Sequence, residues 1–370
     1  MGIELKNPVV AAASALSNKV DNIKRIEDAG AGALVIRSLF EEQIRHEMGE
    51  LDDALQQGAE SSAESLSYFP AIKHGEAKEH LFWVERAREA VKMPLIASLN
   101  AVTPGKWSEY AQKLADTGVD GIEMNYYAVE ASLTSRSCDV EQRLFDTFES
   151  VREAVKLPIA VKLSPFYTCT GSVVQGLEER GANAVVLFNR FFQPDINPET
   201  EALFNQMTYS TETEMRLPLR WVALLYGRVM LDLAGNTGVM TADDVVKFVL
   251  AGATVVQVAS CLFKNGIKHI GALVEGLDAW MDAKGYAEVE DFRGKVILRL
   301  VPGNQVDREW HYRAQVDTEK CIRCGKCERV CIYFAPVLGE KASSITPEKC
   351  AGCGLCVELC PMGAIELVAR

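Results

Sequence analysis

The sequence has few features of a nucleic-acid-binding, membrane or exported protein. Its 39 lysine and arginine residues are outnumbered by 51 aspartate and glutamate residues, which gives a formal net charge of −12. Binding to a phosphate backbone depends on positive charge, so nucleic acid is not an expected partner. The longest early apolar stretch, residues 8–16, is too short to span a bilayer and follows no basic run of the kind that begins a signal peptide. We therefore expect a cytoplasmic protein with no membrane partner.

Compositional extremes are missing as well. Hydrophobic residues make up 48% and charged residues 24% of the 370 residues, which excludes a disordered chain, a collagen and a coiled coil. The length predicts two domains, or one large barrel with an appendage. The G-x-G-x-x-G fingerprint, which marks a dinucleotide-binding site, follows none of the expected strands. If NAD(P)H takes part, we expect it to bind on another chain.

Cysteine, in contrast, is concentrated at the C-terminal end. Eight of the 11 cysteines lie in the last 50 residues, in two runs with the spacing C-x2-C-x2-C-x3-C. Each cysteine of the second run lies 29 residues after its counterpart in the first. Bacterial two-cluster ferredoxins have this spacing, in which three close thiolates bind one [4Fe-4S] cube and the fourth binds the other cube. We therefore expect two [4Fe-4S] clusters, which carry single electrons.

The spacing assigns the eight cysteines to two cluster sites that exchange their fourth ligands. The ligands of the first are Cys321, Cys324, Cys327 and Cys360. The ligands of the second are Cys350, Cys353, Cys356 and Cys331. A zinc site made of the C-x2-C pairs is the alternative, but it would leave the fourth cysteine of each run without a role. A disulfide framework would need an oxidising compartment, for which the sequence shows no export signal.

Before the cysteines, short apolar runs alternate with longer amphipathic stretches, the pattern of βα units with a parallel sheet. Eight strands fit an α/β fold of the (β/α)8 TIM barrel type, and a doubly wound sheet is the alternative that suits the strand count less well. The expected strands are Pro8–Ala13, Ala33–Arg37, Leu95–Leu99, Gly121–Met124, Ile159–Leu163, Ala184–Phe188, Leu231–Ala234 and Val255–Ala259.

The domain boundaries follow from these elements. We expect the barrel over residues 1–283, a linker rich in glycine and proline over residues 284–311, and an α+β ferredoxin-like domain over residues 312–370. Two long loops, residues 38–80 and 190–220, follow the second and sixth expected strands. Long loops at the carboxyl ends of barrel strands usually cover a substrate.

Polar side chains stand where several expected strands end. Asn100, Asn125 and Asn189 each follow an apolar strand. A single asparagine in this position is most simply a turn residue, but three together favour a site for a polar heterocycle, because amides both donate and accept. Lys162 lies between two apolar residues of the fifth strand. A cation inside the barrel suits the N1/C2=O edge of a flavin, whose reduced form is an anion.

Small residues follow the last two expected strands. The seventh strand runs into Gly235–Gly238, and the eighth into Ala259 and Ser260. Backbone N–H groups of these two loops often bind phosphate in barrels of this kind. Together these features predict a ligand with a polar, redox-active ring and a phosphate group, and FMN is such a ligand. It exchanges electron pairs with a substrate and single electrons with iron-sulfur clusters.

These motifs resemble the dihydroorotate dehydrogenase family over roughly residues 3–283. The resemblance rests on Ile122-Glu123-Met124-Asn125, Val161–Pro165, Phe188-Asn189 and the Gly235–Gly238 loop. A barrel followed by a ferredoxin is similar to the pyrimidine-reducing half of dihydropyrimidine dehydrogenase. The resemblance implies that FMN contacts Ala12, Ala13, Arg37, Ser38, Asn100, Asn125, Lys162, Asn189, Gly235, Gly238, Ala259 and Ser260. It also implies that Asn125 and Asn189 face the substrate.

The chain departs from the family pattern at its proton-transferring residue. The family has cysteine or serine three residues after the strand-four asparagine, and this chain has Ala128 there. Alanine cannot carry a proton, so another residue of the same loop is needed for acid-base catalysis. The candidates are Tyr126, Tyr127 and Cys138.

Two arginines also differ from the family pattern. Arg37 stands where the family has lysine, and it keeps a positive charge near the ring. Arg190 follows Asn189, where a small hydroxyl residue is expected. It would clamp an anionic substrate or pair with an acidic side chain.

The sequence therefore predicts an iron-sulfur flavoprotein oxidoreductase of the dihydroorotate/dihydropyrimidine dehydrogenase type. Hydride transfer at flavin N5 on a pyrimidine-like substrate would be coupled to electron transfer through the clusters. The expected redox partner is a flavin/NAD(P)H reductase subunit or a ferredoxin, and a homodimer is possible. One alternative, favoured by Ala128, is an electron-transfer subunit of a larger complex without pyrimidine chemistry. Another is a barrel that has lost FMN and only supports the ferredoxin.

Overall fold

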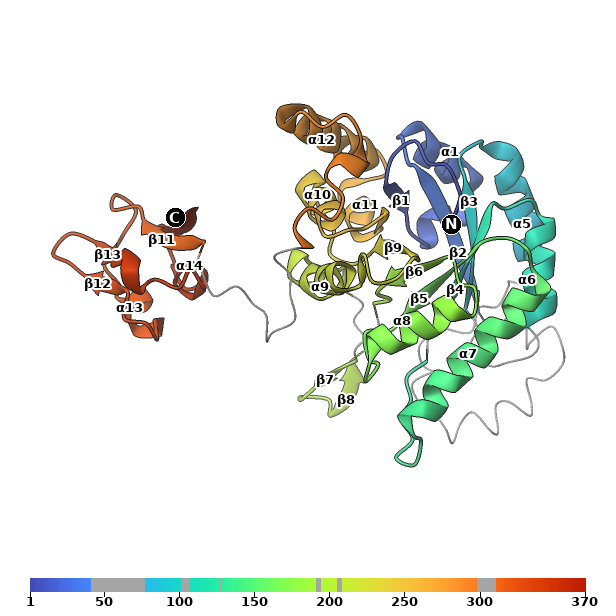
Figure 1. Cartoon of the computed structure of the whole chain (residues 1–370), viewed down its shortest axis with the longest axis horizontal. Helices are drawn as coiled ribbons and strands as arrows, with labels where there is room; N and C mark the ends of the chain where they lie inside the picture. Colours follow the sequence, from blue (N-terminus) through green and yellow to red (C-terminus); the bar gives the residue numbers. More distant parts are fainter. Residues whose placement is uncertain (41–76, 101–106, 127, 191–193, 205–207, 298–310) are drawn as a thin grey trace. The chain divides into compact units, whose positions relative to one another are not determined.

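The structure is a computed structural model that describes residues 1–40, 77–100, 107–126, 128–190, 194–204, 208–297 and 311–370. The chain divides into two compact units, Met1–Pro302 and Gly303–Arg370. Figure 1 shows both units.

The first unit contains a closed barrel of parallel strands, in the order β1-β10-β9-β6-β5-β4-β3-β2. The barrel strands are β1 (Val9–Ala11), β2 (Ala33–Phe40), β3 (Leu95–Asn100), β4 (Gly121–Asn125), β5 (Ile159–Leu163), β6 (Ala184–Leu187), β9 (Asp232–Gly235) and β10 (Val255–Val258). Each overlaps a strand expected from the sequence. The predicted (β/α)8 barrel is confirmed, and the doubly wound alternative is wrong because the sheet closes on itself.

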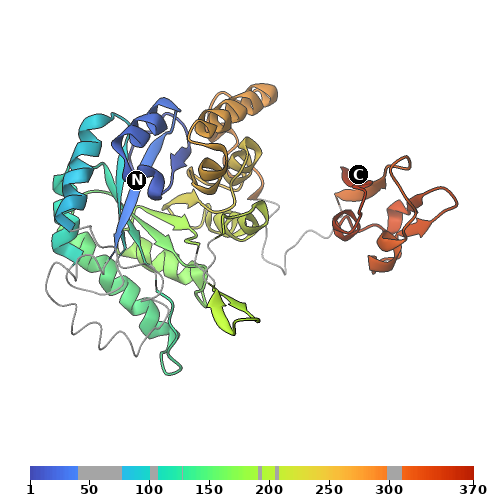
Figure 2. The ribbon, with the colours of Figure 1, turned by 180° about the vertical axis from the view of Figure 1, so that it is seen from behind.

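Helices surround the barrel, as Figures 1 and 2 show from opposite sides. They are α1 (Val20–Asp28), α5 (Ala77–Ala90), α6 (Trp107–Asp116), α7 (Ser137–Ala154), α8 (Thr170–Glu179), α9 (Arg216–Leu225), α10 (Ala242–Leu250), α11 (Ser260–Asn265) and α12 (His269–Lys284). Short 3-10 helices lie at η1 (Ala15–Asn18), η2 (Glu212–Met215) and η3 (Val289–Asp291). Within the described residues, none of the helices is both long enough and apolar enough to cross a membrane.

The barrel strands bury both of their faces. One face packs against the helices and forms the main core, in which Trp107, Phe148, Phe248 and Phe292 are the largest fully buried side chains. The other face points into the barrel, because side chains alternate along a strand. Small apolar side chains fill the lower part of this interior, among them Val10, Ala33, Val35, Ile96, Ala160, Ala184, Val186 and Ala234. Polar side chains also point into the barrel, among them Glu123 and Gln257, and Asn100, Asn125 and Lys162 lie at or near the ends of their strands.

The second expected loop contains regular structure. Residues 190–220 hold an antiparallel hairpin of β7 (Asp195–Asn197) and β8 (Ala202–Phe204), then η2 and the start of α9. The hairpin strands are three residues long and mostly exposed, so they carry no hydrophobic alternation that would reveal them. Most of the first expected loop, residues 41–76, lies outside the described residues.

The expected linker begins too early. Phe292 is fully buried and its ring lies 4.9 Å from that of Trp280 on α12. Nearby, the backbone N–H of Gly294 donates to the carbonyl of Val249 at 2.9 Å. Residues 285–297 therefore pack on the barrel unit, because aromatic side chains between the glycines bury themselves against α12. Residues 298–310 lie outside the described residues.

The second unit is a small α+β domain. Strand β11 (Tyr312–Val316) pairs with β14 (Ile365–Ala369), and β12 (Pro336–Leu338) pairs with β13 (Ser343–Ile345), both antiparallel. Between them lie α13 (Lys326–Val330), η5 (Pro347–Lys349) and α14 (Leu355–Glu358). The residue before each α-helix is a glycine with positive φ, Gly325 at 68° and Gly354 at 82°. The 29-residue repeat of the sequence is thus also a repeat of the backbone.

Candidate functional site

Three of the predicted site residues form a row at the carboxyl end of the barrel. Asn100 on β3 pairs in register with Asn125 on β4, and Asn125 pairs with Lys162 on β5. All three side chains are buried. Among the described residues, the amide oxygens of Asn100 and Asn125 have no hydrogen-bond partner. Buried polar atoms are almost always satisfied, so these two oxygens indicate a bound molecule with N–H or O–H groups.

Lys162 also takes part in a buried polar network. Its Nζ donates to Gln257 Oε1 at 3.4 Å and lies 3.7 Å from Glu123 Oε1. The amide nitrogen of Gln257 donates in turn to the other oxygen of Glu123. Sequence reasoning assigned no role to Glu123 or Gln257. For Glu123, the sequence did contain a signal, because an acidic residue stands between two apolar residues of an expected strand.

Within the described residues, Arg37 is the cationic side chain on the β2 side of the site. Arg37 is half-buried, and burial lowers the pKa of its guanidinium. Its carbonyl lies 3.2 Å from Nε2 of His80, a residue that sequence reasoning missed. Burial also lowers the pKa of His80 to about 4, so that ring is uncharged at neutral pH. Of these two side chains, Arg37 is therefore the one that carries positive charge.

Ser38 connects two strands beside this arginine. Its hydroxyl lies 2.8 Å from that of Ser98 on β3, and both side chains are buried. Ser98 was not predicted. The pair holds the ends of β2 and β3 together, close to Asn100.

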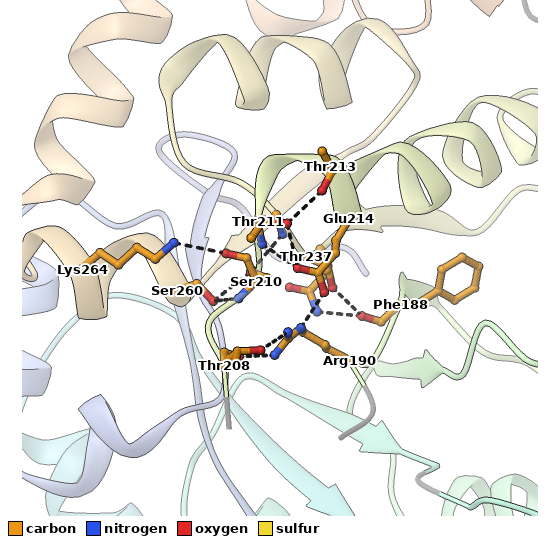
Figure 3. Close-up of polar contacts among 12 residues, drawn as sticks. Phe188, Arg190, Thr208, Ser210, Thr211, Thr213, Glu214, Thr237, Ser260 and Lys264 are labelled. Carbon is orange, nitrogen blue, oxygen red and sulfur yellow. Dashed lines mark hydrogen bonds and ion pairs between the residues drawn. The ribbon is translucent and has the colours of Figure 1, made fainter. Parts of the chain in front are cut away.

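The loops that follow β9 and β10 meet around Ser210, which lies in the segment before η2, as Figure 3 shows. The N–H and the hydroxyl of Ser210 donate to Ser260 Oγ at 3.1 and 2.8 Å. The N–H of Gly238 donates to Ser210 Oγ at 3.2 Å. Two hydroxyls and a backbone N–H thus converge at the predicted phosphate position. Ser210 could not be found from local pattern, because it enters the site from a segment expected to be a loop.

Gly238 is constrained by close backbone contacts. Its φ is +78°, and a Cβ at this position would lie 2.5 Å from the carbonyl oxygen of Thr211 and 2.8 Å from the backbone nitrogen of Met215. Both neighbours are backbone atoms, so they can move away only if the Ser210 segment moves.

Gly238→Ala is therefore expected to weaken retention of a phosphorylated cofactor without unfolding the barrel. We expect at least about a tenfold rise in the dissociation constant, which corresponds to about 1.4 kcal/mol. Fluorescence titration of flavin-depleted protein with FMN measures this. Gly285→Ala is the matched control, because Gly285 also has a positive φ but caps the end of α12. Equal loss of FMN affinity in both variants would contradict a specific role of Gly238.

Arg190 is held by an acid and a backbone segment. Its Nε donates to Glu214 Oε1 at 2.8 Å, and its Nη2 donates to Thr208 Oγ1 at 3.0 Å (Figure 3). Burial opposes the charge of Glu214, but hydrogen bonds from Arg190 and Thr211 keep the pKa of this carboxyl below its usual value. Of the two roles expected for Arg190, the structure displays the pairing with an acid.

The remaining predicted cofactor residues lie on the ends of several strands. The N–H of Ala12 donates to the carbonyl of Val258 at 2.9 Å, and that of Asn189 to the carbonyl of Leu163 at 2.8 Å. Ala13 and Ala259 are half-buried at the ends of β1 and β10. Gly235 faces α10 instead, since a Cβ there would lie 2.3 Å from the ring of Phe248. Its small size serves helix packing.

Two of the three proton-transfer candidates, Tyr126 and Cys138, do not join the row of site residues. Tyr126 is 3% exposed and belongs to the core between the sheet and the helices, on the opposite face of the strand from Asn125. Cys138 is exposed on the first turn of α7, with its sulfur 3.5 Å from Asp139 Oδ1. Tyr127 lies outside the described residues.

In the second unit, the predicted cluster cysteines surround two cavities. The first cavity is lined by Cys321, Cys324, Cys327 and Cys360. The second is lined by Cys331, Cys350, Cys353 and Cys356. These are the two groups of four that the spacing predicts, including the exchange of Cys331 and Cys360.

Backbone donors point at several of these sulfurs. The N–H groups of Ala314, Ser343 and Ala364 donate to the sulfurs of Cys350, Cys321 and Cys360 at 3.3, 3.5 and 3.2 Å. Hydrogen bonds to ligand sulfurs are one of the means by which proteins set cluster potentials. Four thiols around each cavity, with such donors, fit an iron-sulfur cube.

Comparison with known proteins identifies both units. The dihydroorotate dehydrogenase family matches residues 1–281, and a 4Fe-4S dicluster domain matches residues 314–367. The chain belongs to the dihydroorotate dehydrogenase family. The predicted resemblance is confirmed, and the chain is an iron-sulfur oxidoreductase of the dihydroorotate dehydrogenase type. Membership of this family and the dicluster domain together imply flavin and iron-sulfur cofactors.

Three relatives illustrate the range of the family. The chain is 29% identical over 287 residues to dihydroorotate dehydrogenase B (NAD(+)), catalytic subunit, of Methanocella arvoryzae, which covers 76% of this chain and 92% of that protein. It is 25% identical over 303 residues to dihydroorotate dehydrogenase A (fumarate) of Lactobacillus delbrueckii subsp. bulgaricus, with 80% and 96% covered. It is 24% identical over 388 residues to NAD-dependent dihydropyrimidine dehydrogenase subunit PreA of Escherichia coli, with 99% and 93% covered. The similarity to PreA therefore spans both units.

Proposed function

We propose that this chain oxidises or reduces a CH–CH bond of a pyrimidine-like ring, with one FMN in the barrel and two [4Fe-4S] clusters in the second unit. The observation that carries the proposal is the row of Asn100, Asn125 and Lys162, in which the amide oxygens of the two asparagines are buried without a partner among the described residues. FMN, when bound, supplies the exchange between electron pairs and single electrons that joins ring chemistry to clusters.

The residues of the row suit both the flavin and a pyrimidine. Amides of Asn100 and Asn125 accept from ring N–H groups and donate to ring carbonyls. The ammonium of Lys162 stabilises negative charge on a reduced ring. The hydroxyl of Ser260, which accepts from Ser210, would donate to a single phosphate group, and Ser210 and Gly238 hold it in place. The substrate would contact Asn125 and Asn189, as the family resemblance implies.

We further propose a redox partner on another chain. The names of two relatives describe subunits of NAD-linked enzymes, and this sequence has no G-x-G-x-x-G fingerprint after a strand. A partner that exchanges electrons with NAD(P)H, or a ferredoxin, would complete the reaction. We place the complex in the cytoplasm, and homodimerisation of the barrel is part of the same proposal.

Anaerobic spectroscopy tests the proposed function. We expect denaturation to release about one FMN and no FAD per chain, because the part of the barrel that the structure describes offers one phosphate position and no adenosine-binding unit. A dihydropyrimidine, tried among dihydroorotate, dihydrouracil and dihydrothymine, should bleach the flavin absorbance. If none of these, and no pyrimidine added to the reduced protein, changes the spectrum, the protein is the electron-transfer subunit that Ala128 favours. FAD, or no flavin in folded protein, would contradict the proposal itself.

A further inference from the structure

Among the described residues, Glu123 is the least exposed of the charged side chains that point into the barrel. It is 1% exposed, and it lies two residues before Asn125 on β4, so both side chains point into the barrel. Glu123 therefore lies one layer deeper than the row of Asn100, Asn125 and Lys162. A buried carboxylate is costly unless another charge and hydrogen bonds compensate it.

Lys162 and Gln257 provide part of this compensation, and Glu123 Oε1 accepts no hydrogen bond from the described residues. The distance of 3.7 Å between Lys162 Nζ and Glu123 Oε1 makes them an ion pair. Gln257 bridges the two, since its oxygen accepts from Lys162 and its nitrogen donates to Glu123. The network thus holds the Lys162 ammonium from the deeper layer, beneath the row that carries the two unsatisfied amide oxygens.

The negative charge of Glu123 also weakens the electric field of Lys162. In a buried site, charges a few ångströms apart interact far more strongly than in water. With Glu123 present, the two side chains together are neutral. Without its charge, the lysine would present an uncompensated positive charge to any ring bound at the row.

We propose that Glu123 is a positioning residue that holds Lys162 and sets the reduction potential of the bound flavin by partly neutralising the lysine. This inference rests on the proposed FMN site. In this proposal the reduction potential of the flavin depends on the charges of both Glu123 and Lys162 and not on Lys162 alone. A purely structural ion pair would stabilise the barrel but would leave the potential of the flavin unchanged when its charge is removed.

Measurement of the two-electron midpoint potential by anaerobic dye equilibration tests the proposal. Glu123→Gln keeps the shape and removes the charge, so we expect a higher potential, by at least a tenfold change in the equilibrium between reduced and oxidised flavin, which is about 30 mV for two electrons. Lys162→Met should lower the potential. The double variant should return close to the unmodified protein, since the site is again neutral. Glu109→Gln, on the exposed side of α6, is the matched control and should change nothing.

The outcomes separate this inference from the proposed function. If the unmodified protein binds no FMN, the proposed function fails and the inference with it. If FMN is bound but Glu123→Gln has an unchanged or lower potential, only the inference is overturned. If Glu123→Gln loses FMN, Glu123→Asp is used instead. Its side chain is shorter by one methylene, so its carboxylate lies farther from Lys162. It is expected to raise the potential by a smaller amount, and a fall or no change would overturn the inference.

Discussion

Replacing Ala128 with cysteine is expected to raise the rate of pyrimidine turnover by about 10²–10⁴-fold, the usual contribution of a positioned acid or base. Ala128 stands where the family has its proton-transferring residue, three positions after Asn125. The structure places Tyr126 in the core and Cys138 on the solvent-exposed first turn of α7, so neither supplies a proton at the row. Steady-state turnover of the reactive pyrimidine, with FMN occupancy measured in the same sample, checks the expectation.

Matched variants separate proton transfer from packing. Ala128 is half-buried and packs against the core. Ala128→Val adds bulk without a titratable group, so it should not raise the rate. Cys138→Ala should leave turnover unchanged in both the unmodified protein and Ala128→Cys. If Ala128→Cys gives no gain at full FMN occupancy, Tyr127 or solvent transfers the proton. A Tyr127→Phe variant that loses activity would then identify the tyrosine.

Patterns that depend on neighbouring residues were readable from the sequence. The apolar runs gave all eight barrel strands, because each strand is buried on both faces and punctuated by polar or glycine residues. The asparagines at the ends of β3 and β4 could be placed in one row because parallel strands finish at the same edge. The cysteine spacing predicted two groups of four that the structure also gathers.

Features that depend on contacts between distant segments could not be read. Ser210 reaches Ser260 across 50 residues of sequence, and His80 reaches Arg37 across 43. Gln257 bridges Glu123 and Lys162 from the far side of the barrel, and no local pattern marks it. The burial of Phe292 likewise depends on α12, so a stretch rich in glycine was interpreted as a linker. In each case the chemistry of the residue was visible but its partner was not.

Cys360→Ala is expected to remove the same cluster as Cys324→Ala, although the two positions lie 36 residues apart. Both cysteines line the cavity that also contains Cys321 and Cys327. Iron should fall from about eight to about four per chain in either variant. Electron transfer from the flavin to an external one-electron acceptor should fall by at least tenfold. Reduction of the flavin by substrate should be unchanged, because the barrel residues that hold it belong to the other unit.

The comparison of four variants distinguishes exchanged ligands from sequential ones. If the fourth ligands are exchanged, Cys360→Ala and Cys324→Ala retain the same cluster and give the same electron paramagnetic resonance spectrum after reduction. Cys331→Ala and Cys353→Ala then share a second, different spectrum, because both line the other cavity. If each run instead binds its own cluster, Cys360→Ala will match Cys353→Ala. Zinc in place of iron after anaerobic purification would reject both arrangements. With exchanged ligands, each cluster joins the two halves of the repeat. Loss of Cys331 or Cys360 should therefore lower the stability of the whole second unit and not only that of the run that contains the replaced cysteine.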